Sequence, residues 1–126
     1  MRPRILVVED DRVFRHMLKH WLEKEGYEPV LAETLEEGFI GIAAEPLPYA
    51  VLLDIHLGDK SGLTLAHWAR RQRHLSHMPI VALTGTDNLK DRKRSHDAGC
   101  DAHFPKPIDF IALRKFLVSL GVFSAP

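Results

Sequence analysis

The sequence predicts an α/β fold: a doubly wound, five-stranded parallel sheet with five helices. Five short apolar runs alternate along the chain with five segments of helical spacing, which is typical of parallel sheets covered on both faces. The third and fourth runs, residues 50–53 and 79–83, are continuously hydrophobic, as expected for strands buried on both sides. We therefore expect right-handed crossovers between successive parallel strands.

The size and charge of the chain fit one domain, residues 1–126, with a core at about 4–120. Seventeen Lys and Arg balance seventeen Asp and Glu, so we expect no direct nucleic-acid binding. No apolar run approaches the roughly 20 residues that span a bilayer, and acids close the run at residues 5–8, so we expect no membrane segment or signal peptide. The single cysteine, Cys100, suits a reducing, cytoplasmic location.

The predicted strands are short apolar runs bounded by charged or turn residues. They comprise residues 5–8, 29–32, 50–53, 79–83 and 102–104. The first helical segment, residues 12–25, ends at Gly26. Its apolar side chains expected near one face are Val13, Met17, Trp21 and Leu22.

The other four helices follow from capping signals and apolar spacing. A capping box opens the second, with Thr34 as N-cap and Glu37 three residues later. The third spans about residues 61–72, and the fourth spans about 88–98 with Asp87 as its cap. The fifth begins near Asp109, and its apolar side chains are Phe110, Leu113, Phe116, Leu117 and Leu120.

Polar residues follow four of the strands, at the edge where ligands bind in open parallel sheets. They are Glu9 and Asp10 after the first strand, Asp54 after the third, Thr84 after the fourth and Lys106 after the fifth. Carboxylate oxygens suit Mg²⁺, and a lysine ammonium suits a phosphate oxygen. A carboxylate can also attack phosphorus and form an aspartyl-phosphate. The pattern indicates phosphoryl-transfer chemistry at a magnesium site.

On these residues the chain resembles the receiver domain of bacterial two-component response regulators, the family of the chemotaxis response regulator. The resemblance covers Arg4 to about Leu120. It implies a flavodoxin-like fold with strand order 2-1-3-4-5. It also implies a phosphorylation-activated switch rather than an enzyme, which accepts a phosphoryl group from a sensor histidine kinase or phosphotransfer protein. The switch would act on a downstream protein target as a monomer or a phosphorylation-dependent dimer.

The resemblance also implies a role for each site residue. Asp54 is the phosphoacceptor, and Mg²⁺ is held by Asp54, Asp10, Glu9 through water, and the backbone carbonyl of His56. Thr84 is the switch hydroxyl and Lys106 contacts the phosphoryl group. Changes at these residues would alter the surface formed by the fourth helix, fifth strand and fifth helix.

Further positions also match the family, some with a different residue. Gly62 matches the family glycine, and Gly58 stands where many members have Pro. His103 occupies the position of the rotating aromatic residue, where Tyr or Phe is commoner. His56 and Thr86 match positions that tune the lifetime of the phosphoryl group.

Other interpretations of the same residues and fold are consistent with the sequence. Each acid, Thr84 and Lys106 could be an ordinary capping, turn or surface residue, and capping is the favoured interpretation for Asp11. The same fold could signal without phosphorylation, through protein contacts alone. A small phosphatase with an aspartyl nucleophile would usually need a second acid, where this chain has His56. A flavodoxin-like cofactor binder would need a phosphate-cradling loop, and the loop here is acidic.

Overall fold

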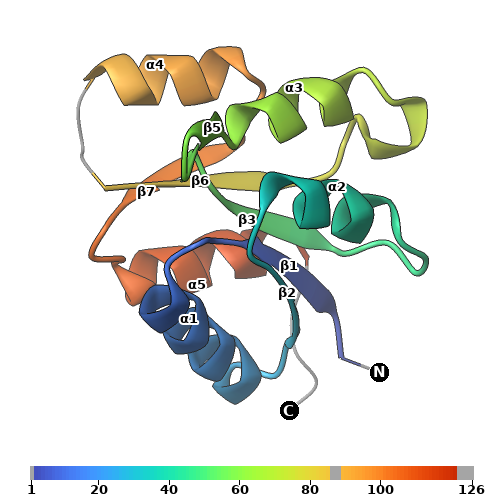
Figure 1. Cartoon of the computed structure of the whole chain (residues 1–126). Helices are drawn as coiled ribbons and strands as arrows, with labels where there is room; N and C mark the ends of the chain where they lie inside the picture. The colour runs from blue at the N-terminus through green and yellow to red at the C-terminus, as the bar shows by residue number, and fades with distance from the viewer. Residues whose placement is uncertain (1, 86–88, 122–126) are drawn as a thin grey trace.

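The computed structural model describes residues 2–85 and 89–121, and its central element is a five-stranded parallel sheet (Figure 1). The strands are β1 (Arg4–Val8), β2 (Glu28–Ala32), β3 (Ala50–Asp54), β6 (Ile80–Thr84) and β7 (Ala102–Pro105). They are paired in the order β2-β1-β3-β6-β7. Counted along the chain, this is the predicted order 2-1-3-4-5.

The helices cover both faces of the sheet, as predicted. They are α1 (Arg12–Lys24), α2 (Leu35–Ala43), α3 (Leu63–Arg70), α4 (Leu89–Asp97) and α5 (Phe110–Ser119). Figure 1 shows α1 and α5 on one side of the sheet and α2, α3 and α4 on the other. The predicted cap Asp87 and first residue Asn88 of the fourth helix lie outside the described residues.

A short antiparallel hairpin follows β3 and was not predicted. Its strands are β4 (His56–Leu57) and β5 (Lys60–Ser61), with Gly58 at a positive φ of 63° in the turn. Because the hairpin uses Ser61, α3 begins at Leu63 rather than at residue 61. The predicted third helix also ends early, and η1 (Arg73–Leu75), a 3₁₀ turn, follows it.

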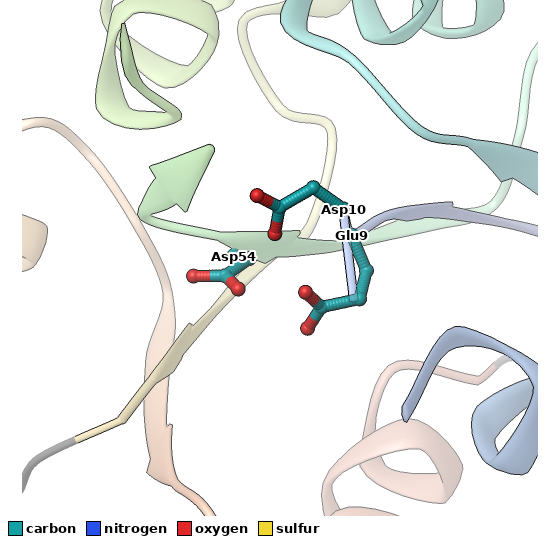
Figure 2. A group of neighbouring side chains, drawn as sticks. All are labelled: Glu9, Asp10 and Asp54. Atoms are coloured by element: carbon teal, nitrogen blue, oxygen red, sulfur yellow. The ribbon is translucent and has the colours of Figure 1, made fainter. Parts of the chain in front are cut away.

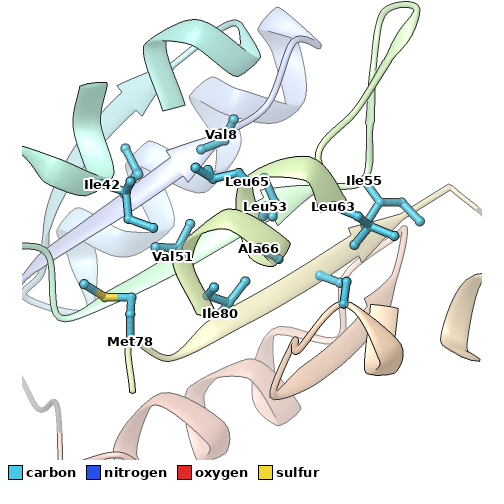
Figure 3. Packing of buried hydrophobic residues seen from close by; sticks show 14 of the residues in the cluster. Val8, Ile42, Val51, Leu53, Ile55, Leu63, Leu65, Ala66, Met78 and Ile80 are labelled. Atoms are coloured by element: carbon cyan, nitrogen blue, oxygen red, sulfur yellow. The ribbon is translucent and has the colours of Figure 1, made fainter. Parts of the chain in front are cut away.

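Alternating side chains of the central strands enter two apolar clusters, one on each face. On the face of α2, α3 and α4, Val51, Leu53 and Ile80 pack against the helices (Figure 3). On the other face, Ala50 and Leu52 pack against α1 and α5. This period of two is the geometry of strands covered on both sides. Because the paired strands are parallel, their carboxyl ends lie together at one edge of the sheet.

The predicted inner face of α1 is wrong in part. The buried residues of this helix are Phe14, Arg15, Leu18 and Leu22. Val13 is 78% exposed and Met17 is 41% exposed, although both were expected on the packed face. Apolar residues come in adjacent pairs in this helix, so they form two neighbouring apolar faces, and either could pack against the core. The face formed by Phe14, Leu18 and Leu22 is the one that packs against the sheet and α5.

Local caps explain where the first two helices begin. Asp11 Oδ1 accepts hydrogen bonds from the backbone N–H groups of Val13, at 3.0 Å, and Phe14, at 3.4 Å. Asp11 is therefore the N-cap of α1, as expected. Thr34 Oγ1 accepts from the N–H of Glu37 at 3.1 Å, which confirms half of the capping box. The Glu37 carboxylate accepts from the N–H of Glu33, one residue before the position that the motif predicts.

Candidate functional site

The site lies where the parallel strands end together. In the register of the sheet, Val8 is opposite Leu53, and Thr84 is opposite Pro105. Residues that follow these positions therefore share one edge, although they are far apart in sequence. The lysine is tied to this edge by its own backbone, because its N–H donates to the carbonyl of Thr84 at 2.7 Å. The five side chains predicted from the strand ends are thus brought to one edge of the sheet.

Glu9 and Asp10 are consecutive, yet they occupy different environments. The N–H of Glu9 continues the sheet by donating to the carbonyl of Ala32 at 3.0 Å. Its side chain is fully buried, whereas Asp10 is exposed. Glu9 Oε2 accepts from the N–H of Asp11 at 3.1 Å, and Asp10 Oδ2 accepts from the N–H of Gly58 at 2.9 Å. Each carboxylate is therefore oriented by a backbone N–H.

Asp54 is the last residue of β3 and is almost completely buried. Its Oδ1 accepts from the N–H of His56 at 2.8 Å, and its Oδ2 accepts from Lys106 Nζ at 2.9 Å. Gly62 packs directly on its backbone: a Cβ at Gly62 would lie 2.1 Å from the Asp54 carbonyl oxygen. Only glycine fits at that position without moving Asp54.

Lys106 is the cation of the site. Its Nζ lies 2.6 Å from Glu9 Oε1 as well as 2.9 Å from Asp54 Oδ2. The ammonium also lies over the ring of Phe14, 4.4 Å from the centroid, which is a cation–π contact. Burial lowers the pKa of Lys106, but the hydrogen bonds to Glu9 and Asp54 outweigh it and raise this pKa overall. Lys106 is therefore charged throughout the physiological range.

Three carboxylates, those of Glu9, Asp10 and Asp54, converge at this edge of the sheet (Figure 2). Among the described residues, Glu9, Asp10 and Asp54 form the one group of three or more acidic, His or Cys side chains with ligand atoms within 4.8 Å of one another. Burial, and then hydrogen bonding with Asp54, raise the pKa of Glu9 to about 7, against the opposite effect of Lys106. The all-oxygen donor set fits a hard divalent cation such as Mg²⁺.

The two residues predicted to form the switch, Thr84 and His103, lie on neighbouring strands. Thr84 is fully buried at the end of β6, and its Oγ1 is 3.2 Å from His103 Nε2 on β7. His103 is half-buried. An imidazole nitrogen can hydrogen-bond a hydroxyl in this geometry, which a Phe ring could not do. The two residues assigned to the switch are in direct contact.

The two positions expected to tune the phosphoryl group have different outcomes. His56 lies in β4, and its Nε2 is 3.8 Å from Asp91 Oδ2 on α4. Thr86 lies outside the described residues.

An open pocket of about 230 Å³ adjoins Asp10, between the β4–β5 hairpin and the start of α2. Of the three carboxylates, Asp10 is the one that lines this pocket.

Two residues around the site were missed from the sequence. Phe14 faces the ammonium of Lys106, and Arg15 donates to the backbone carbonyls of Glu9 and Asp10. A signal for Arg15 was present, because it stands three and seven residues before Leu18 and Leu22, on the apolar face of a helix. A charge at such a position needs polar partners.

Comparisons with known proteins extend over most of the chain. The family model for the response regulator receiver domain matches residues 5–118. The polar-differentiation response regulator DivK of Brucella ovis is 31% identical over 108 residues, which cover 86% of this chain and 87% of that protein. In the described part of the chain, no helix is long and apolar enough to cross a bilayer.

Two solved structures share the fold and a quarter or more of the residues. A CheY-like response regulator receiver domain protein from Methanospirillum hungatei has a TM-score of 0.83 and 34% identity, covering 96% of this chain and 95% of that one. The non-phosphorylated HemR receiver domain from Leptospira biflexa has a TM-score of 0.81 and 28% identity, covering 99% of this chain and 98% of that one.

Proposed function

This chain belongs to the response regulator receiver domain family, and from that premise we propose that Asp54 accepts a phosphoryl group from a partner histidine kinase or phosphotransfer protein. The observation that carries the proposal is the contact of Lys106 Nζ with both Asp54 and Glu9. It places a fixed positive charge beside the carboxylate that is to react. Receiver domains are signalling switches, and the proposed chemistry serves signalling rather than turnover of a metabolite.

The proposed transfer is a displacement at phosphorus. A carboxylate oxygen of Asp54 attacks the phosphorus of a phosphohistidine on the partner, and an acyl-phosphate O–P bond forms. The N–P bond breaks, and its electron pair stays on the imidazole nitrogen of the partner. Lys106 Nζ, 2.9 Å from Asp54 Oδ2, would stabilise the negative charge of the transferring group.

The acidic residues would hold the required cation. Glu9 through water, Asp10, Asp54 and the backbone carbonyl of His56 are the proposed Mg²⁺ contacts. When bound, Mg²⁺ offsets negative charge on the carboxylates and on the transferring phosphoryl group. The arrangement of Glu9, Asp10 and Asp54 supports this, because ligand oxygens of all three lie within 4.8 Å of one another.

The proposed output is a change of the α4–β7–α5 surface. A phosphoryl group on Asp54 adds charge and acceptor oxygens that attract the Thr84 hydroxyl away from His103. A cavity of about 140 Å³ adjoins His103 and is lined in part by Ser95 and Cys100, so the imidazole has space to move. Phe104 of β7 contacts Phe116 of α5, with centroids 6.4 Å apart, and this contact would transmit the change. A downstream protein, or a second copy of this chain, would then bind the altered surface.

Phosphotransfer from a panel of phosphorylated histidine kinases tests the proposal. We expect at least one kinase to label the unsubstituted protein, no label on an Asp54→Asn variant, and slow labelling of an Asp10→Asn variant. An Asp97→Asn variant is the matched control, because this carboxylate pairs with Lys93 on the exposed side of α4. Label that persists in the Asp54→Asn variant would show that the phosphoacceptor is another residue.

A further inference from the structure

Arg15 is a buried cation on the apolar face of α1. Its side chain is 7% exposed, and its neighbours on the buried face are Phe14, Leu18 and Leu22. A guanidinium is costly to remove from water unless its N–H groups find acceptors. The identity of those acceptors therefore indicates what this arginine contributes.

The acceptors belong to the two residues that carry the metal-binding carboxylates. One terminal nitrogen, Nη1, donates to the carbonyl oxygen of Glu9 at 2.9 Å and to that of Asp10 at 3.3 Å. The side chains of both residues stay available to the site, since Arg15 binds only their backbone. The rigid guanidinium thus fixes the main chain from which both carboxylates extend.

The other terminal nitrogen reaches a second loop. Arg15 Nη2 lies 3.3 Å from Glu33 Oε1, in the turn between β2 and α2. Glu33 is 64% exposed, so this ion pair is solvent-screened and weaker than the buried bonds to the carbonyls. Arg15 therefore links the acidic loop after β1 to the neighbouring loop after β2.

From these contacts we propose that Arg15 is a positioning residue, which holds the backbone of Glu9 and Asp10 so that the divalent-cation site is formed before the cation binds. The proposal rests on the proposed function. Mg²⁺ tolerates little departure from octahedral geometry, so small movements of its ligands weaken binding. Groups behind the ligands typically contribute about tenfold or more to metal affinity.

Calorimetric titration with MgCl₂ tests the proposal on folded protein. Arg15→Lys keeps a positive charge, but its ammonium is one atom closer to the backbone than Arg15 Nη1 and should not reach the carbonyls of Glu9 and Asp10. We therefore expect its Mg²⁺ affinity to fall about tenfold. Glu33→Gln leaves the carbonyl contacts in place, and its affinity should change less than about twofold, since the Arg15–Glu33 pair is exposed. A small phosphodonor should label Arg15→Lys slowly at low Mg²⁺ concentration and at the rate of the unsubstituted protein at high Mg²⁺ concentration, because the substitution weakens only cation binding.

Arg70→Lys is the matched control. Arg70 also donates to backbone carbonyls, those of Gly99 at 2.8 Å and Met78 at 2.7 Å, but at the opposite edge of the sheet. Arg70→Lys should lower the free energy of unfolding and leave the Mg²⁺ affinity unchanged. The proposal is overturned if Arg15→Lys binds Mg²⁺ as tightly as the unsubstituted protein, or if Arg70→Lys weakens binding equally. Absence of Mg²⁺ binding by the unsubstituted protein would overturn the metal site itself, and the role of Arg15 with it.

Discussion

Lys106 Nζ lies 2.9 Å from Asp54 Oδ2, although 52 residues separate the two along the chain. The same nitrogen lies 2.6 Å from Glu9. Without a bound cation, this one ammonium is the positive charge that bridges the buried carboxylates. Lys106 therefore stabilises the acidic edge, and under the proposed function the same ammonium would contact the phosphoryl group.

Substitution of Lys106 should therefore destabilise the protein most when Mg²⁺ is absent. For Lys106→Met we expect a loss of about 2 kcal/mol in the free energy of unfolding, typical of lost hydrogen bonds to charged groups. Saturating Mg²⁺ should reduce this loss, because the cation offsets the same carboxylates. Urea unfolding with and without Mg²⁺ measures both values. The control is Lys93→Met, which removes one partner of an exposed ion pair on α4 and should lower the free energy of unfolding by less than about 0.5 kcal/mol in either condition. If Lys106→Met lowers the free energy of unfolding equally with and without Mg²⁺, the prediction is wrong.

The raised pKa of Glu9 predicts a pH dependence of stability in Mg²⁺-free solution. The folded pKa is about 7 and the ordinary value is 4.5, so the folded state retains a proton that the unfolded state loses. The contribution of Glu9 is complete below about pH 4.5 and is lost as pH rises to about 7. Its slope cannot exceed about 1.4 kcal/mol per pH unit, the limit for one proton. The difference in unfolding free energy between the unsubstituted protein and Glu9→Gln, followed over this range, should show the slope, and a flat difference would refute it.

Gly62 should tolerate no side chain. A Cβ there would lie 2.1 Å from the backbone oxygen of Asp54, which cannot move without displacing the acid. We expect Gly62→Ala to lower the unfolding free energy by about 3 kcal/mol. Gly85→Ala is the control, since a Cβ at Gly85 meets no atom of the described residues within 4 Å. Similar thermal unfolding curves for the two variants would show that the Gly62 contact is unimportant.

Val13 should contribute to partner recognition. It is exposed in the first turn of α1, two residues after Asp11, and the proposed phosphotransfer would bring a partner to this end of the helix. We expect Val13→Ser to slow transfer from a histidine kinase about fivefold, the equivalent of about 1 kcal/mol, and to leave labelling by a small phosphodonor unchanged. Ile40→Ser, on α2, should change neither rate. Equal slowing with both donors would place the effect at Asp54 instead of the interface.

Much of the fold could be predicted because local and global signals agree. The continuously apolar strands identified the buried sheet, and Thr34 identified the start of α2. The face of α1 could not be predicted, since Val13–Phe14, Met17–Leu18 and Trp21–Leu22 offer two stripes of similar hydrophobicity. Only packing against the sheet and α5 selects between them.

The candidate site also has features that could be predicted from the sequence and features that could not. The acids, Asp54, Thr84 and Lys106 could be located because topology alone brings the ends of parallel strands together. The β4–β5 hairpin and the contacts of Arg15 could not, because they depend on hydrogen bonds between loops that are distant in sequence. The hairpin is set by two paired residues on each side, too short a pattern for periodicity to reveal.

Intact-mass spectrometry after incubation with a small-molecule phosphodonor measures directly whether Asp54 is phosphorylated with the help of Mg²⁺. We expect the protein to gain the mass of one phosphoryl group when Mg²⁺ is present and to gain none after Mg²⁺ is removed. We expect no gain for an Asp54→Asn variant in either condition. A gain that does not need Mg²⁺, or one that survives in the Asp54→Asn variant, would show that the proposed phosphorylation site is wrong.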